Sequence, residues 1–111
     1  MTLLDNINVA GTDYRVKTSL VLGNCSTPAG TEVKVCSFDN TFTLTAGNVF
    51  AITFQYANTY GDGSTLYPKI SVNGTSYPLK LLVGAYAASG AWADGQTVVM
   101  YFDGTNFVKI I

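Results

Sequence analysis

One six-residue pattern occurs three times in this chain: an apolar residue, any residue, Gly, Thr, a polar residue and an aromatic residue. The copies read VAGTDY at 9–14, VNGTSY at 72–77 and FDGTNF at 102–107. Asn-Gly and Asp-Gly favour tight turns because Gly adopts positive φ without a steric penalty. Thr and aromatic residues favour strands. Each copy therefore predicts two strands joined by a tight turn.

Three β-hairpins follow from these copies. The second copy predicts that Lys69–Val72 pairs with Ser76–Leu79, and the third that Val98–Phe102 pairs with Asn106–Ile110. The first copy has the weaker turn signal Ala10-Gly11 and predicts a third hairpin, Ile7–Val9 with Asp13–Val16. Because the copies are unequally spaced, we interpret them as shared turn chemistry rather than as a repeat architecture.

Two further strands are predicted from alternation. In the stretch 31–38, TEVKVCSF, alternation places Val33, Val35 and Ser37 on one face of a half-buried strand. In the stretch 49–56, VFAITFQY, Phe50, Ile52 and Phe54 share a face that we expect to lie in the core. No stretch sustains a helical period. The prediction is an all-β chain, an antiparallel β-sandwich that is jelly-roll-like or a small barrel, built of hairpins.

The low charge of the chain bears on its partners. Its 111 residues suffice for one domain, and only 12% of them are charged, about half the usual share of roughly 25%. A surface with so few charges suggests that other copies of the chain cover part of it. Thr- and Asn-rich surfaces also occur on monomers, so both states stay open at this point.

Several classes of function are excluded by composition. The net charge is −1 and the six basic residues are dispersed, so we expect no nucleic-acid partner. The longest apolar tract, 79–93, is interrupted by Lys80 and by glycines, so we expect no membrane insertion. The chain has no histidine and one glutamate, Glu32, which leaves little for nucleophilic, metal-dependent or glycosidic catalysis. We therefore expect no enzyme and no cofactor.

The two cysteines, Cys25 and Cys36, are eleven positions apart. A zinc site would need two more ligands, which the absence of histidine makes hard to supply. Two states remain open: a pair of buried free thiols, or a Cys25–Cys36 disulfide under oxidising conditions.

Recognition is the function that remains. Tyr and Trp give a large contact area with a polar tip at low entropic cost. The loop 57–65 and the segment 84–95, with their flanks, supply the candidates for ligand binding, which are Tyr56, Asn58, Tyr60, Asp62, Tyr67, Tyr86 and Trp92. The aromatic residues would stack on a sugar face, with Asn58, Asp62 and Asn48 as hydrogen-bonding partners. Packing in the core or between subunits is the alternative for Trp92 and Tyr86.

Most of the chain, about 24–110, resembles a module of phage and prophage tail-fibre, head-fibre and other virion appendage proteins. The matching pieces are CSTPAGTEVKVC, FTLTAGNVFAITF, ISVNGTSYPL and WADGQTVVMYFDGTNFVKI, in that order. The resemblance implies a β-sandwich module, commonly trimeric, displayed on the virion surface, with no catalytic residues. Two features depart from the family pattern: a longer loop between Phe54 and Leu66, and Phe107 in place of Trp.

The expected function is thus a non-enzymatic virion structural protein, a fibre or capsid-decoration module. It would form a homotrimer, contact other virion proteins and bind host surface glycans. We expect an N-terminal hairpin or docking segment at 1–23 and the appendage module at 24–111, with Leu3 and Leu4 among the apolar residues that dock. The alternative is a monomeric bacterial carbohydrate-binding module, and a small glycosidase is a third reading.

Overall fold

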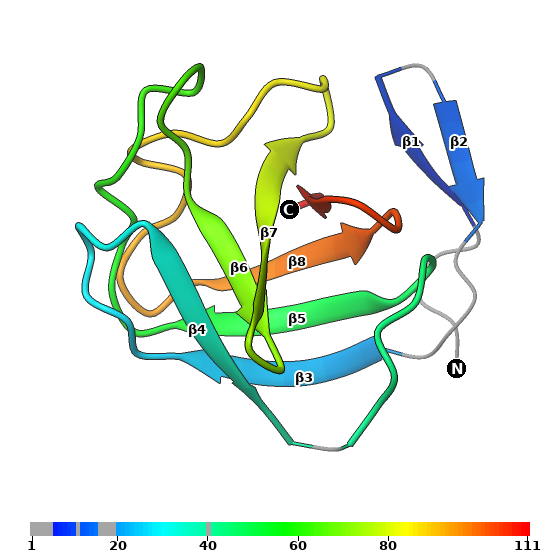
Figure 1. Cartoon of the computed structure of the whole chain (residues 1–111), viewed down its shortest axis with the longest axis horizontal. Coiled ribbons are helices and arrows are strands. Elements are labelled where there is room, and N and C mark those ends of the chain that lie inside the picture. The colour runs from blue at the N-terminus through cyan, green and yellow to red at the C-terminus, as the bar shows by residue number, and fades with distance from the viewer. Residues whose placement is uncertain (1–5, 11, 16–19, 40) are drawn as a thin grey trace.

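The computed structural model describes residues 6–10, 12–15, 20–39 and 41–111, and this part of the chain is all-β, without a helix. Its strands, drawn in Figure 1, are β1 (Asn6–Val9), β2 (Thr12–Arg15), β3 (Leu20–Cys25), β4 (Val33–Phe38), β5 (Val49–Phe54), β6 (Lys69–Val72), β7 (Thr75–Leu81), β8 (Thr97–Phe102) and β9 (Phe107–Lys109). The all-β prediction is confirmed.

Seven strands form one mixed sheet. They hydrogen-bond in the order β3-β4-β6-β7-β9-β8-β5, and β5 also pairs with β3, so the sheet closes on itself. In Figure 1, β3, β5 and β8 lie side by side across the view, while β4, β6 and β7 run steeply over them. The first two strands, β1 and β2, form a separate two-stranded sheet. The core lies inside the closed sheet.

The three predicted hairpins are present. Asn73 and Gly74, both at positive φ, join β6 to β7, with Val72 opposite Thr75. The turn between β8 and β9 has Gly104 at φ 106°, and the Asp103 carboxylate accepts hydrogen bonds from the amides of Thr105 and Asn106. The third hairpin joins β1 to β2 through Ala10, also at positive φ. Turn chemistry alone sufficed for these pairings.

The antiparallel sandwich is wrong. Three of the seven pairings in the closed sheet are parallel: β3 with β5, β4 with β6, and β7 with β9. Parallel neighbours need crossover connections between strands far apart in the sequence, and no short sequence pattern reports them. Because the seven strands belong to one sheet, there are no two stacked sheets of hairpins.

The predicted core of β5 is confirmed. Phe50 and Ile52 are fully buried, and Phe54 is 1% exposed. Phe50 contacts the ring of Phe107 on β9, with centroids 5.3 Å apart, and Phe54 stacks on Trp92 at 4.1 Å. Aromatic side chains from β5, from β9 and from the segment that contains Trp92 therefore meet in the interior of the closed sheet.

In β4, the inner face is not the one that the alternation suggested. Val35 is 61% exposed, whereas its neighbour Lys34 is 1% exposed. Phe38, on the same face as Lys34, packs against Phe50. Burial of the large Phe38 ring removes more apolar surface from water than burial of Val35 would. The Lys34 side chain accompanies Phe38 inward and donates to backbone carbonyls, as described below.

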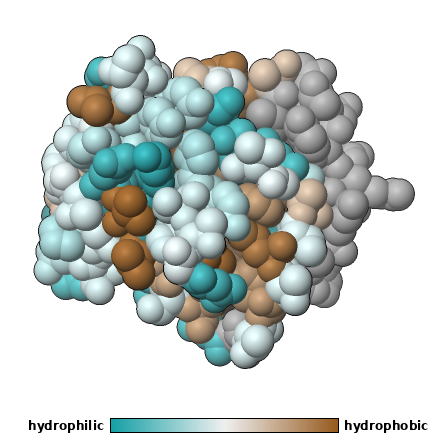
Figure 2. Space-filling model, in the orientation of Figure 1, coloured by the Kyte–Doolittle hydropathy of each residue, from teal (hydrophilic) through white to brown (hydrophobic). Residues whose placement is uncertain are grey.

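The N-terminal segment is only partly described. The expected boundary between residues 23 and 24 falls inside β3, which pairs with β4 and β5. Leu3 and Leu4 lie outside the described residues. On the face shown in Figure 2, apolar residues lie as separate spots among weakly polar ones, in agreement with the low charge of the chain.

Candidate functional site

The loop 55–68 is held against the segment 84–92, which brings together the two stretches that carry the predicted ligand-binding residues. Asn58 is 1% exposed, and its amide nitrogen donates to the carbonyls of Tyr60 (2.8 Å) and Ala88 (2.9 Å). Its amide oxygen accepts from the Tyr60 amide. The Asn58 side chain therefore forms its hydrogen bonds within the loop and to the segment 84–92, and it is not available to a ligand.

Asp62 shapes the tip of the same loop. One of its carboxylate oxygens accepts hydrogen bonds from the amides of Ser64, Thr65 and Leu66, at 2.8–3.0 Å. These backbone hydrogen bonds lower the pKa of Asp62. Gly61, at φ 109°, precedes it, and a Cβ there would lie 2.9 Å from the Leu66 carbonyl oxygen. Asp62 is thus a turn residue whose carboxylate accepts hydrogen bonds from the backbone amides of the turn.

Tyr67 and Tyr86 stack on each other. Their ring centroids are 4.0 Å apart with an angle of 9° between the planes. Lys69 Nζ lies 5.5 Å from the Tyr67 centroid, and Lys80 Nζ lies 5.0 Å from the Tyr86 centroid. Ring stacking and cation–π contacts make this a rigid cluster. Since each ring is in contact with the other ring and with a lysine, the stack presents hydroxyl edges and ammonium groups rather than a free face.

Charge pairing continues from this stack. The Lys69 ammonium donates to the Glu32 carboxylate at 2.6 Å, which lowers the pKa of Glu32 and raises that of Lys69. Desolvation, together with the nearby Glu32 carboxylate, raises the pKa of the Tyr60 hydroxyl. Tyr60, Tyr67 and Tyr86 therefore belong to one polar aromatic cluster.

Trp92 is in the core. It is 3% exposed, stacks on Phe54 and donates its indole N–H to the Tyr56 carbonyl oxygen at 3.0 Å. Its ring is therefore not available to a sugar, and Trp92 has the role in core packing that was the alternative to ligand binding. Asn48, the remaining hydrogen-bonding candidate, is 3% exposed, and its side-chain oxygen accepts from the Thr45 amide.

A second surface was missed by sequence reasoning. Registers across β4, β3, β5 and β8 place four polar residues side by side, a polar row made of Ser37, Asn24, Thr53 and Thr97. The hydroxyls of Thr53 and Thr97 are 2.8 Å apart. Only the pairing of four strands brings these residues together, so no short sequence signal could have found the row.

A cavity of about 350 Å³ opens beside the polar row, lined by Asn24, Cys25, Ser26, Val35, Ser37, Thr53 and Gln55. Tyr56 follows Gln55, and its hydroxyl accepts from the Gln55 amide nitrogen at 3.1 Å. Tyr56 is 42% exposed. Hydroxyl and amide groups beside an exposed tyrosine can hydrogen-bond to a polar ligand while the ring contacts its apolar face.

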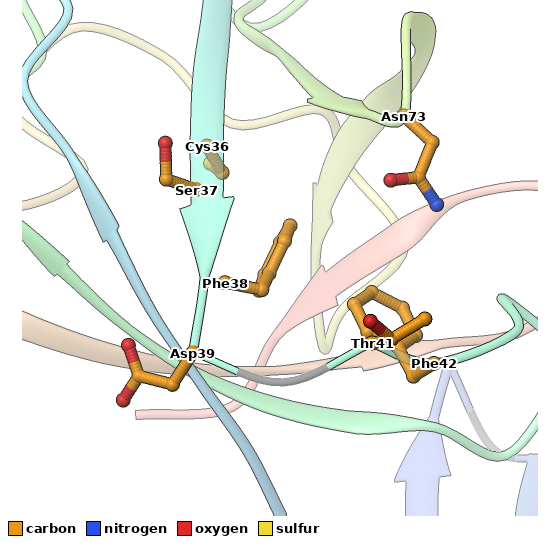
Figure 3. Close-up of a pocket in the computed structure, with 7 residues that line it drawn as sticks. All are labelled: Cys36, Ser37, Phe38, Asp39, Thr41, Phe42 and Asn73. Atoms are coloured by element: carbon orange, nitrogen blue, oxygen red, sulfur yellow. The ribbon is translucent and has the colours of Figure 1, made fainter.

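A second cavity, of about 340 Å³, lies where β4 and β6 separate beyond their last paired residues, Val35 and Ser71. Figure 3 shows its lining: Cys36, Ser37 and Phe38 from β4, Asn73 from the β6–β7 turn, and Asp39, Thr41 and Phe42 from the connection that follows β4. Phe38 and Phe42 meet edge to face, with centroids 5.1 Å apart.

The described residues contain no group of three or more His, Cys, Asp or Glu side chains that could hold a metal ion. Within the described ranges, no helix is both long and apolar enough to cross a membrane. Comparison of the chain with family models, with curated proteins and with solved structures gives no match in any of the three.

Proposed function

We propose that this protein is a non-enzymatic recognition module of a bacteriophage virion, a fibre or capsid-decoration unit that binds glycans of the host surface. The observation that carries the proposal is the polar row beside exposed Tyr56. The resemblance of residues 24–110 to virion appendage modules supplies the biological setting. In this proposal the closed sheet is the small-barrel form of such a module, and other virion proteins anchor it.

The row suits a neutral sugar. Hydroxyl and amide side chains both donate and accept hydrogen bonds, as sugar hydroxyls do. Asn24 and Gln55 are exposed, and neither residue carries a charge that would require an ionic ligand. The Tyr56 ring offers the apolar contact that the Tyr67–Tyr86 stack does not.

A glycan array with matched variants tests the site. Tyr56→Ala and Asn24→Ala should each reduce binding about tenfold, because each removes a contact worth roughly 1–1.5 kcal/mol. Tyr86→Ala is the control, since it removes an aromatic ring from the other surface. Loss of binding in the control with retention in Tyr56→Ala would move the site to the tyrosine stack. A wild-type chain that binds no glycan on the array would refute glycan recognition.

Homotrimer formation is supported by a second apolar cluster on the outside of the sheet. Val49 and Tyr101 are buried there beneath partly exposed apolar residues, which are Leu20, Leu82, Val99 and Ile110. Next to this cluster, Val83 is 77% exposed and Ile111 is 68% exposed. Burial of such a surface between copies removes apolar area from water.

Light scattering tests the assembly. The wild-type chain should scatter as a trimer, and Val83→Asp together with Ile111→Lys should scatter as a monomer. A monomeric wild-type protein that still binds glycans would favour the alternative, a bacterial carbohydrate-binding module. Incorporation into particles after deletion of residues 1–20 tests the docking segment, and unchanged incorporation would refute it.

A further inference from the structure

Cys25 and Cys36 face each other across two antiparallel strands. The register of β3 and β4 places them directly opposite, and both are free thiols. Cys25 belongs to the buried core, and Cys36 packs against it. Directly opposed residues have Cβ atoms about 4.5–5.5 Å apart, a little beyond the roughly 3.5–4.5 Å of a disulfide. A small approach of the two strands would therefore allow the bond.

The Cys25 sulfur is surrounded by hydrogen-bond donors. The neighbouring Cys36 thiol, whose sulfur donates to the Lys34 carbonyl oxygen at 3.6 Å, is the largest cause that lowers the pKa of Cys25 to about 6. The hydroxyl and the amide of Thr27 lower it further, against the opposing effect of burial. The interaction with Cys25, together with burial, raises the pKa of Cys36. One thiol of the pair is thus set to ionise and the other to stay protonated.

A buried lysine supplies the counter-charge. Lys34 is 1% exposed, and its ammonium donates to the carbonyls of Ala29 (3.0 Å) and Pro28 (3.4 Å). Burial lowers the pKa of Lys34, whereas its attraction to Cys25 raises it. An ammonium taken out of water is stabilised by a nearby anion. The Cys25 thiolate is such an anion, and its attraction to Lys34 is the smallest of the causes that lower the pKa of Cys25.

We propose that Cys25 and Cys36 form a thiol–disulfide exchange site, with Cys25 as the attacking thiolate and Cys36 as the resolving thiol. The oxidant is a low-molecular-weight disulfide such as oxidised glutathione. The Cys25 thiolate attacks one of its sulfurs, forms a mixed disulfide and releases one glutathione thiolate. Cys36 then loses its proton to solvent and attacks Cys25, which releases the second glutathione. The protein dithiol is oxidised and the glutathione disulfide is reduced to two thiols.

Each of the two cysteines is among the residues that line a cavity. Cys25 lines the cavity beside the polar row, and Cys36 lines the cavity at the end of β4 (Figure 3). A disulfide that closes only when its two strands approach each other stores strain and is readily reduced. We therefore expect the site to be reversible, unlike a structural disulfide, and it links β3 and β4, two of the four strands that the polar row crosses.

Mass spectrometry of the intact protein after treatment with oxidised glutathione tests the order of steps. The wild-type chain should lose the mass of two hydrogens. Cys36→Ser should stop at the mixed disulfide, with the mass of one glutathione added, and Cys25→Ser should react at least tenfold more slowly. A wild-type chain that stays reduced, or a Cys25→Ser variant that reacts as fast as Cys36→Ser, would overturn the proposal.

The pH dependence of alkylation provides a second readout. Of the described residues around the Cys25 sulfur, Cys36 and Lys34 of β4 are titratable, and Phe54, its neighbour on β5, is not. In Cys36→Ser, which keeps a hydroxyl donor, the rate of modification of Cys25 by iodoacetamide should reach half its plateau near pH 6. Lys34→Met should shift this midpoint upward.

The alkylation rate of Cys25 can also be measured against pH on the wild-type chain by peptide mapping. This measurement tests the proposal even if a variant fails to fold. A modification rate that still rises through about pH 8, as for an ordinary thiol with a pKa of about 8.5, would contradict an activated Cys25.

Discussion

Taking every second residue as one face predicts the inner side of the strand correctly in β5 but not in β4. In β5 the apolar face that includes Phe50 and Phe54 is buried. In β4, Val35 points outward, and Lys34 and Phe38 belong to the inner face. Alternation reports which residues share a face, whereas the side that is buried depends on what the neighbouring strands can accommodate.

Two contacts explain the difference. Gly23 lies opposite Phe38 on β3, and its missing side chain leaves room for the Phe38 ring, whose nearest atom would be 2.7 Å from an added Cβ. The carbonyls of Pro28 and Ala29 accept hydrogen bonds from the Lys34 ammonium. A lysine can therefore lie inside because a loop folds its backbone oxygens over it.

The largest effect is expected in β5. Phe54→Ala should lower the free energy of unfolding by about 3–5 kcal/mol, because it removes a buried ring that stacks on Trp92 and leaves a cavity. Urea denaturation followed by circular dichroism measures the change. Ser76→Ala, an exposed position on β7, is the control and should stay within about 0.5 kcal/mol of wild type. A loss below about 1 kcal/mol for Phe54→Ala would contradict the assigned core.

A smaller loss is expected where β3 meets β4. Gly23→Ala should destabilise the protein by about 1–3 kcal/mol, since the new methyl group would overlap the Phe38 ring and the Ser37 carbonyl oxygen, 2.8 Å away. Gly30→Ala is the matched control, because the nearest atom to an added Cβ there is 3.7 Å away. Equal stability of the two variants in thermal denaturation would mean that Phe38 does not pack against β3.

How much could be predicted depends on the range of each interaction. A few consecutive residues determine the hairpin at Asn73-Gly74 and the core face of β5, and both features were predicted. The parallel pairing of β3 with β5 joins segments separated by β4, and the inward turn of Lys34 depends on a loop and on Gly23. These depend on tertiary packing, which local patterns do not encode.

The candidate site divides in the same way. Exposed Tyr56 and the clustered Tyr60, Tyr67 and Tyr86 were found because tyrosine in a polar loop is a local signal. Asn58 and Trp92 were predicted from the same loop and segment, but both are buried because the loop 55–68 folds onto the segment 84–92. The polar row needs the register of four strands, which only the closed sheet supplies.

The pH dependence of stability distinguishes the buried thiol of Cys25 on β3 from the buried ring of Phe54, its neighbour on β5. Folding lowers the pKa of Cys25 from 9.0 to about 6, so the unfolded chain binds more protons between these values. The stability of the reduced protein should therefore rise as pH increases from about 6 to 9, and this contribution is lost as pH falls through 6. The chain has no histidine that would titrate in this window.

Urea denaturation of the reduced protein at pH 6 and at pH 8.5 measures this dependence. Cys25→Ser should abolish the rise in stability between the two pH values. Phe54→Ala should lower the free energy of unfolding by the same amount at both pH values, provided that Cys25 keeps its lowered pKa in this variant. The terminal amine titrates alike in all three proteins and cancels in the comparison. If stability still rises between pH 6 and pH 8.5 in Cys25→Ser, another titrating group causes the pH dependence.

The smallest effect is expected at Val35. Since Val35 is 61% exposed, Val35→Lys should change the free energy of unfolding by no more than about 0.5 kcal/mol. If β4 had the orientation that its alternation suggested, the same substitution would bury an unpaired ammonium and cost several kcal/mol. Denaturation of Val35→Lys beside Ile52→Lys on β5, which should not fold, therefore tests the orientation of β4 directly. Failure of Val35→Lys to fold would reverse the inner and outer faces of β4 and, with them, the buried position of Lys34.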